Sequence, residues 1–175
     1  MNHLPNRATR RCLIDIVTTW AEKIAQELAP QEIDQVPFIV KDFVQGGKAR
    51  RDLLKPQRSG GALGGFGLGD FSNLLAWALQ GIVVTAPLLC SVLSSEAVPN
   101  TIALLKELKA VTHTRHTKTP TSSPTINKGV EQLTANIAAS GMSQGQREEA
   151  ACKVMIVLLE NPSQAVAFIQ KLTEK

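Results

Sequence analysis

The feature that most constrains the fold of this chain is the stretch 71–95, in which no side chain is charged. A transmembrane helix needs about 20 mostly apolar residues, because each residue of a helix rises roughly 1.5 Å across a hydrocarbon layer of about 30 Å. A helix buried at the centre of a globule also carries few charges. The stretch is therefore expected to lie in a bilayer or inside the protein.

Two observations favour the bilayer. Charge is absent over the whole length, whereas even a central soluble helix usually carries one or two charges at its ends. The flanks are also uneven, because residues 41–58 hold six basic and two acidic side chains while residues 96–110 are neutral. By the positive-inside rule the N-terminal side stays in the cytoplasm. The residues expected to face lipid are Leu74, Leu75, Trp77, Leu79, Ile82, Val83, Val84, Leu88 and Leu89.

A second pattern within the stretch is a stripe of polar residues and proline at intervals of seven: Asn73, Gln80, Pro87 and Ser94. Such a spacing places all four on one side of a helix, and we predict a helix–helix contact there. In lipid the stripe would mediate self-association or pack against another span through hydrogen bonds. In a globule it would face a polar pocket or neighbouring backbone.

The basic side chains before the apolar stretch are expected to bind anionic lipid headgroups. They are Lys48, Arg50, Arg51, Lys55 and Arg58. A polybasic segment beside an apolar run gains about 1 kcal/mol per charge at a membrane surface. Nucleic acid is an unlikely partner, because no groove-reading motif accompanies these residues, and the chain has no tyrosine and an aromatic content of only 4%.

The rest of the chain has helical periodicity interrupted by glycine and proline. We expect helices over 8–29, which ends at Pro30, and over 36–45, which Gly46 and Gly47 end, with another helical turn or two before Pro56. Residues 59–70 are rich in glycine and are interpreted as a hinge. An amphipathic helix is expected over 96–111, followed by a flexible linker at 112–127 that is rich in Thr, Ser and Pro.

Residues 128–175 are predicted to form a C-terminal three-helix interaction module. Asn127 can cap its first helix, Ser143 with Gln146 forms a capping box for the second, and Asn161 with Pro162 begins the third. Its expected partner-binding residues are Val154, Met155, Leu158, Phe168 and Ile169.

No residue constellation indicates catalysis or a cofactor. His113 and His116 lie three residues apart, but no acidic residue or cysteine accompanies them, so we expect no metal site. Cys12, Cys90 and Cys152 are far apart, which favours a reducing compartment over a disulfide framework. No serine has a nucleophile-elbow setting. We expect no catalytic residue, no metal and no cofactor.

The sequence therefore predicts an all-α fold with helical segments around one long apolar helix. Residues 1–58 form amphipathic helices with a basic end, and the hinge, the apolar segment, the amphipathic helix, the linker and the C-terminal module follow. The predicted function is that of a non-catalytic, membrane-associated adaptor or membrane-perturbing effector, recruited by a protein partner through residues 128–175. Self-association into a homo-oligomer is a further expectation. The alternative is a soluble cytoplasmic adaptor or regulatory subunit that buries residues 71–95 in its core or in a dimer interface.

Overall fold

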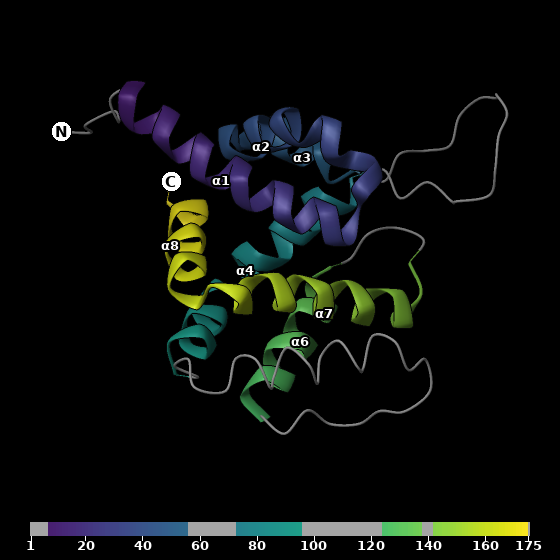
Figure 1. Ribbon diagram of the computed structural model, residues 1–175. Coiled ribbons are helices and arrows are strands. Elements are labelled where there is room, and N and C mark those ends of the chain that lie inside the picture. The colour runs from purple at the N-terminus through teal and green to yellow at the C-terminus, as the bar shows by residue number, and fades with distance from the viewer. Residues whose placement is uncertain (1–6, 56–72, 96–123, 138–141, 175) are drawn as a thin grey trace, which may run out of the picture.

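The computed structural model describes residues 7–55, 73–95, 124–137 and 142–174, and these ranges contain helices and no strand (Figure 1). The elements in chain order are α1 (Arg7–Leu28), the 3-10 helix η1 (Pro30–Gln35), α2 (Val36–Gln45), α3 (Gly47–Leu53), α4 (Leu74–Ser95), α6 (Pro124–Asn136), α7 (Gln144–Glu160) and α8 (Pro162–Thr173). The prediction of an all-α fold around one long apolar helix is confirmed. The predicted hinge at 59–70, the predicted helix at 96–111, Arg58 and most of the predicted linker lie outside the described residues.

The N-terminal helices follow the punctuation of the sequence. α1 ends two residues before Pro30, and α2 covers the predicted range 36–45. Gly46 and Gly47 separate α2 from α3 with φ angles of 70° and 59°, a region that glycine adopts at little steric expense. The sequence analysis did not anticipate η1, a short 3-10 helix that begins at Pro30 and joins α1 to α2.

The caps of the C-terminal helices are those expected, with one correction. Ser143 and Gln146 form a reciprocal capping box at the start of α7, and the Asn161 side chain accepts a hydrogen bond from the Gln164 amide at the start of α8. The prediction that Asn127 caps the first of these helices is wrong, because α6 already begins at Pro124. Proline is favoured in a first helical turn, where its missing N–H leaves no helical hydrogen bond unmade. The predicted linker therefore overlaps the first residues of α6.

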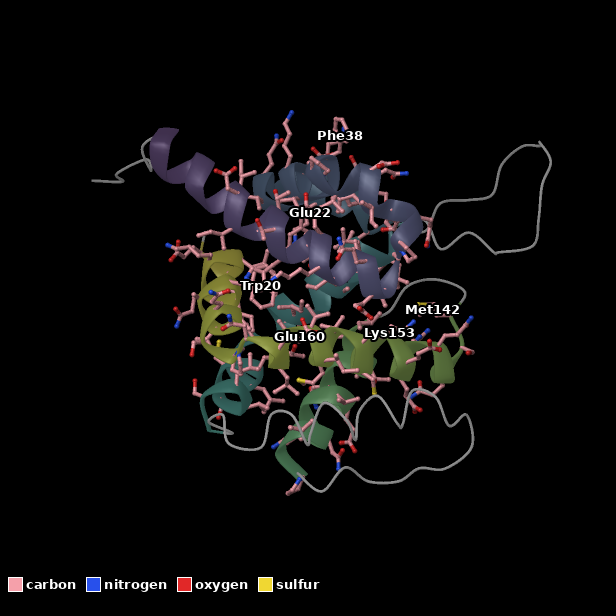
Figure 2. The ribbon with its side chains drawn as sticks, in the orientation of Figure 1. Trp20, Glu22, Phe38, Met142, Lys153 and Glu160 are labelled. Carbon is pink, nitrogen blue, oxygen red and sulfur yellow. The ribbon has the colours of Figure 1, made fainter. Side chains whose placement is uncertain are left out.

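The core is organised around α4, which packs most extensively on α6 and α8 and also touches α1, α2 and α7. In Figure 1, α4 passes behind α1 and α7, and α8 stands beside it at the left. α7 and α8 meet at 114°, so the chain turns sharply and α8 can lie against α4. The rings of Trp20 on α1 and Phe168 on α8 stack with their centroids 5.3 Å apart. Figure 2 shows Trp20 pointing from α1 toward the place where α7 and α8 meet.

The contact between α4 and α6 depends on glycine. A Cβ atom at Gly129 of α6 would lie 2.7 Å from the Met155 Cε atom and within 4 Å of Val92 and Leu89 on α4. A Cβ atom at Gly81 of α4 would lie 3.2 Å from the Ile137 side chain. Because neither glycine has a side chain, the axes of α4 and α6 approach closely and the apolar residues around them fill the space.

Candidate functional site

The two sides of α4 have different surroundings. Its inner side is fully buried by the helices around it and consists of Leu75, Leu79, Ile82, Leu89 and Val92, together with small residues between them. Truncation of a fully buried Leu or Ile to Ala typically costs about 2–5 kcal/mol. Because the chain already uses these side chains for its own core, only the outer side of α4 is available to another molecule.

The outer side carries a row of six positions at alternating steps of three and four residues, and Asn73, just before α4, precedes them by four residues. We call this row the outer seam, and it consists of Trp77, Gln80, Val84, Pro87, Ser91 and Ser94. The first two are half-buried and the last four are exposed. Val84 is 52% exposed, an unusual value for valine in the middle of an apolar helix. Steps of four and three are the spacing at which a second helix packs along the first at a small crossing angle.

One arginine binds Gln80 in the N-terminal part of the outer seam. Nε and Nη2 of Arg50 on α3 donate hydrogen bonds of 3.0 Å and 2.7 Å to Oε1 of Gln80. The same guanidinium lies 4.0 Å from the ring centre of Phe43 on α2. Burial lowers the pKa of Arg50, although arginine remains charged at any ordinary pH. Arg50, which was expected to bind lipid headgroups, therefore binds Gln80 of the predicted stripe instead.

The N-terminus of α4 is held by a buried carboxylate. Glu32 of η1 is only 4% exposed, and its two oxygens accept hydrogen bonds of 2.9 Å and 3.1 Å from the amides of Leu74 and Leu75. These amides belong to the first turn, whose N–H groups have no partner within the helix. Desolvation raises the pKa of Glu32, and the hydrogen bonds from the backbone oppose that rise without cancelling it. The carboxylate thus fixes the position of α4 relative to η1.

The structure divides the residues that were expected to face lipid. Leu74, Leu75, Leu79, Ile82 and Leu89 are buried in the chain's own core, whereas Trp77, Val83 and Leu88 are half-buried and Val84 is exposed. The described residues therefore form no continuous apolar belt around α4. The helix Leu74–Ser94 is nevertheless long and apolar enough to cross a membrane, and a little over half of it is buried.

The residues of the predicted headgroup site also have different surroundings from one another. Of the expected headgroup ligands, Lys48 and Arg51 on α3 and Lys55 just after it are exposed, and Lys55 forms a salt bridge of 2.6 Å with Asp52. Arg50 is turned onto Gln80, as described above. Of the predicted stripe, Gln80, Pro87 and Ser94 belong to α4 and are spaced along its outer side. Asn73 precedes the helix with a φ angle of 80°, so helical spacing does not place it there.

The expected partner-binding residues are not on the surface. Val154, Met155, Leu158, Phe168 and Ile169 are fully buried. The prediction that they form a partner surface is wrong for this conformation, because α7 and α8 use their apolar sides to cover α4 and α1. A short three-helix segment has too little core of its own, so its apolar residues are buried against the rest of the chain.

Two residues that the sequence analysis missed are prominent. Nothing around Glu32 in its polar segment indicates burial, because its partners lie about forty residues later in the chain. Phe38 at the start of α2 is 70% exposed and points away from the molecule (Figure 2). The exposure of Phe38 could have been predicted from the helical pattern of the sequence. The apolar face of α2 is formed by Val36, Ile39, Val40 and Phe43, and it leaves Phe38 on the same side as Lys41.

Within the residues that the structure describes, no group of three or more His, Cys, Asp or Glu side chains is placed to hold a metal ion. The three histidines lie outside those residues. Comparison of the chain with protein-family models, with curated proteins and with solved structures gives no match in any of the three. The geometry of α4 and its surroundings is therefore the basis for a functional assignment.

Proposed function

We propose that this protein is a non-catalytic helical adaptor or regulatory subunit that binds a partner helix along the outer seam of α4. The observation that carries the proposal is the exposure of Val84, at 52%, in the middle of a helix whose inner side forms the core. Pro87 on the same side is also exposed, and Trp77 is half-buried there.

The composition of the outer seam supports a helix as the partner. Val84 and Trp77 offer apolar area, while Pro87, Ser91 and Ser94 are small enough to let another backbone approach closely. The alternating spacing fits the packing of two helices at a shallow angle. Lipid tails are a poorer match, because the exposed hydroxyl groups of Ser91 and Ser94 gain no hydrogen bond from hydrocarbon.

Site-specific photo-crosslinking in cells that express the protein tests this proposal. A photoreactive amino acid at Val84 is expected to give a discrete crosslinked protein band. The same amino acid at Phe38 is the matched control, because Phe38 is also apolar and even more exposed but lies on α2, away from the seam. Equal crosslinking from both positions, or none from Val84, contradicts the proposal.

A second candidate function, a membrane-associated effector, is favoured by the length and apolar character of Leu74–Ser94. In this proposal α4 leaves the core and enters the bilayer, and the exposed Lys48, Arg51 and Lys55 contact headgroups. Entry requires that the inner side of α4 separate from α6 and α8, which exposes their apolar residues and so needs a compensating partner or membrane.

Flotation with anionic vesicles and carbonate extraction of membranes test the second candidate. We expect an inserted protein to resist carbonate, and Val83→Lys to abolish that resistance because a lysine in mid-span is costly. Val83 is half-buried and packs against the core, so circular dichroism must show that the variant is folded before it is compared. A protein that stays in the carbonate supernatant and does not float with vesicles excludes this candidate.

A further inference from the structure

We draw no further inference here: the strongest candidate, the exposed apolar surface patch that Phe38 forms at the start of α2, carries none, because nothing in the part of the chain that the structure describes shows what covers it.

Discussion

The carboxylate of Glu32 offers the sharpest test of how α4 is held in this fold. Its oxygens accept hydrogen bonds from the amides of Leu74 and Leu75 in a site that is nearly closed to water. A buried donor left without its acceptor costs about 1–3 kcal/mol. Glu32→Ala leaves two such donors unpaired, but it also removes the cost of burying the carboxylate. The net effect is expected to lower the free energy of unfolding by about 2–4 kcal/mol.

The pH dependence of stability tests the balance of forces on the same group. Burial raises the pKa of Glu32 above its ordinary value of 4.5, so the folded protein binds a proton at higher pH than the unfolded chain does. The contribution of Glu32 to stability is therefore complete below about pH 4.5 and declines as the pH rises through the folded-state pKa. Relative to Glu32→Gln, which does not titrate, the wild-type protein should gain stability as the pH is lowered from neutral.

Urea denaturation followed by far-ultraviolet circular dichroism, repeated between neutral pH and about pH 3, measures both effects. Asp52 is a control of opposite sign, because the hydrogen bond from Lys55 lowers its pKa. Relative to Asp52→Asn, the wild-type protein should lose stability on acidification below the ordinary value of 3.8. If the wild-type protein loses stability relative to Glu32→Gln on acidification, the hydrogen bonds outweigh desolvation and the reasoning is wrong. A loss below about 0.5 kcal/mol for Glu32→Ala shows that the cap is not formed.

Three further changes test the packing around α4. Gly145→Ala, whose new methyl group has nothing within 4 Å, should raise the free energy of unfolding by about 0.5 kcal/mol. Gly129→Ala must displace the flexible end of the buried Met155 side chain and should give a smaller gain or a loss; urea denaturation in which Gly129→Ala gains as much as Gly145→Ala contradicts the packing. A double-mutant cycle of Arg50→Met and Gln80→Ala should give a coupling energy of about 1 kcal/mol, and additive losses would mean that their hydrogen bonds do not contribute. The pKa of Cys152 is raised to about 11 by burial, so in a protein with this cysteine alone, thiol labelling should be slow at neutral pH and fast after unfolding; rapid labelling of the folded protein would place Cys152 at the surface.

Several features of the fold could be predicted from sequence because they depend on neighbouring residues. The capping box at Ser143 and the cap at Asn161 each use a side chain and an amide three residues apart. The stop at Gly46 depends on the conformational freedom of glycine alone. Local signals of this kind do not require knowledge of the rest of the chain, and the fold class follows from them.

The sites depended on distant contacts, and there the predictions were less successful. Arg50 resembled any other residue of a basic segment, but in the structure it binds Gln80, thirty residues away. Glu32 gave no sign of burial, since its partners are the amides of α4. Val154 and Phe168 have the character of partner-binding residues, and only the folded chain shows that the partner is the protein itself.

The sequence by itself determined that this protein is helical, that one long apolar helix lies within residues 71–95, and that Gln80, Pro87 and Ser94 are spaced to share one side of it. Only the tertiary structure decided which side of α4 is covered and which is left open. The physical reason is that the polar side of α4 carries no charge, so its sequence suits a contact with another helix as well as it suits water, and the helices that cover α4 are distant in the chain. The helices that arrive from both ends of the chain bury one side and leave Val84 on the other.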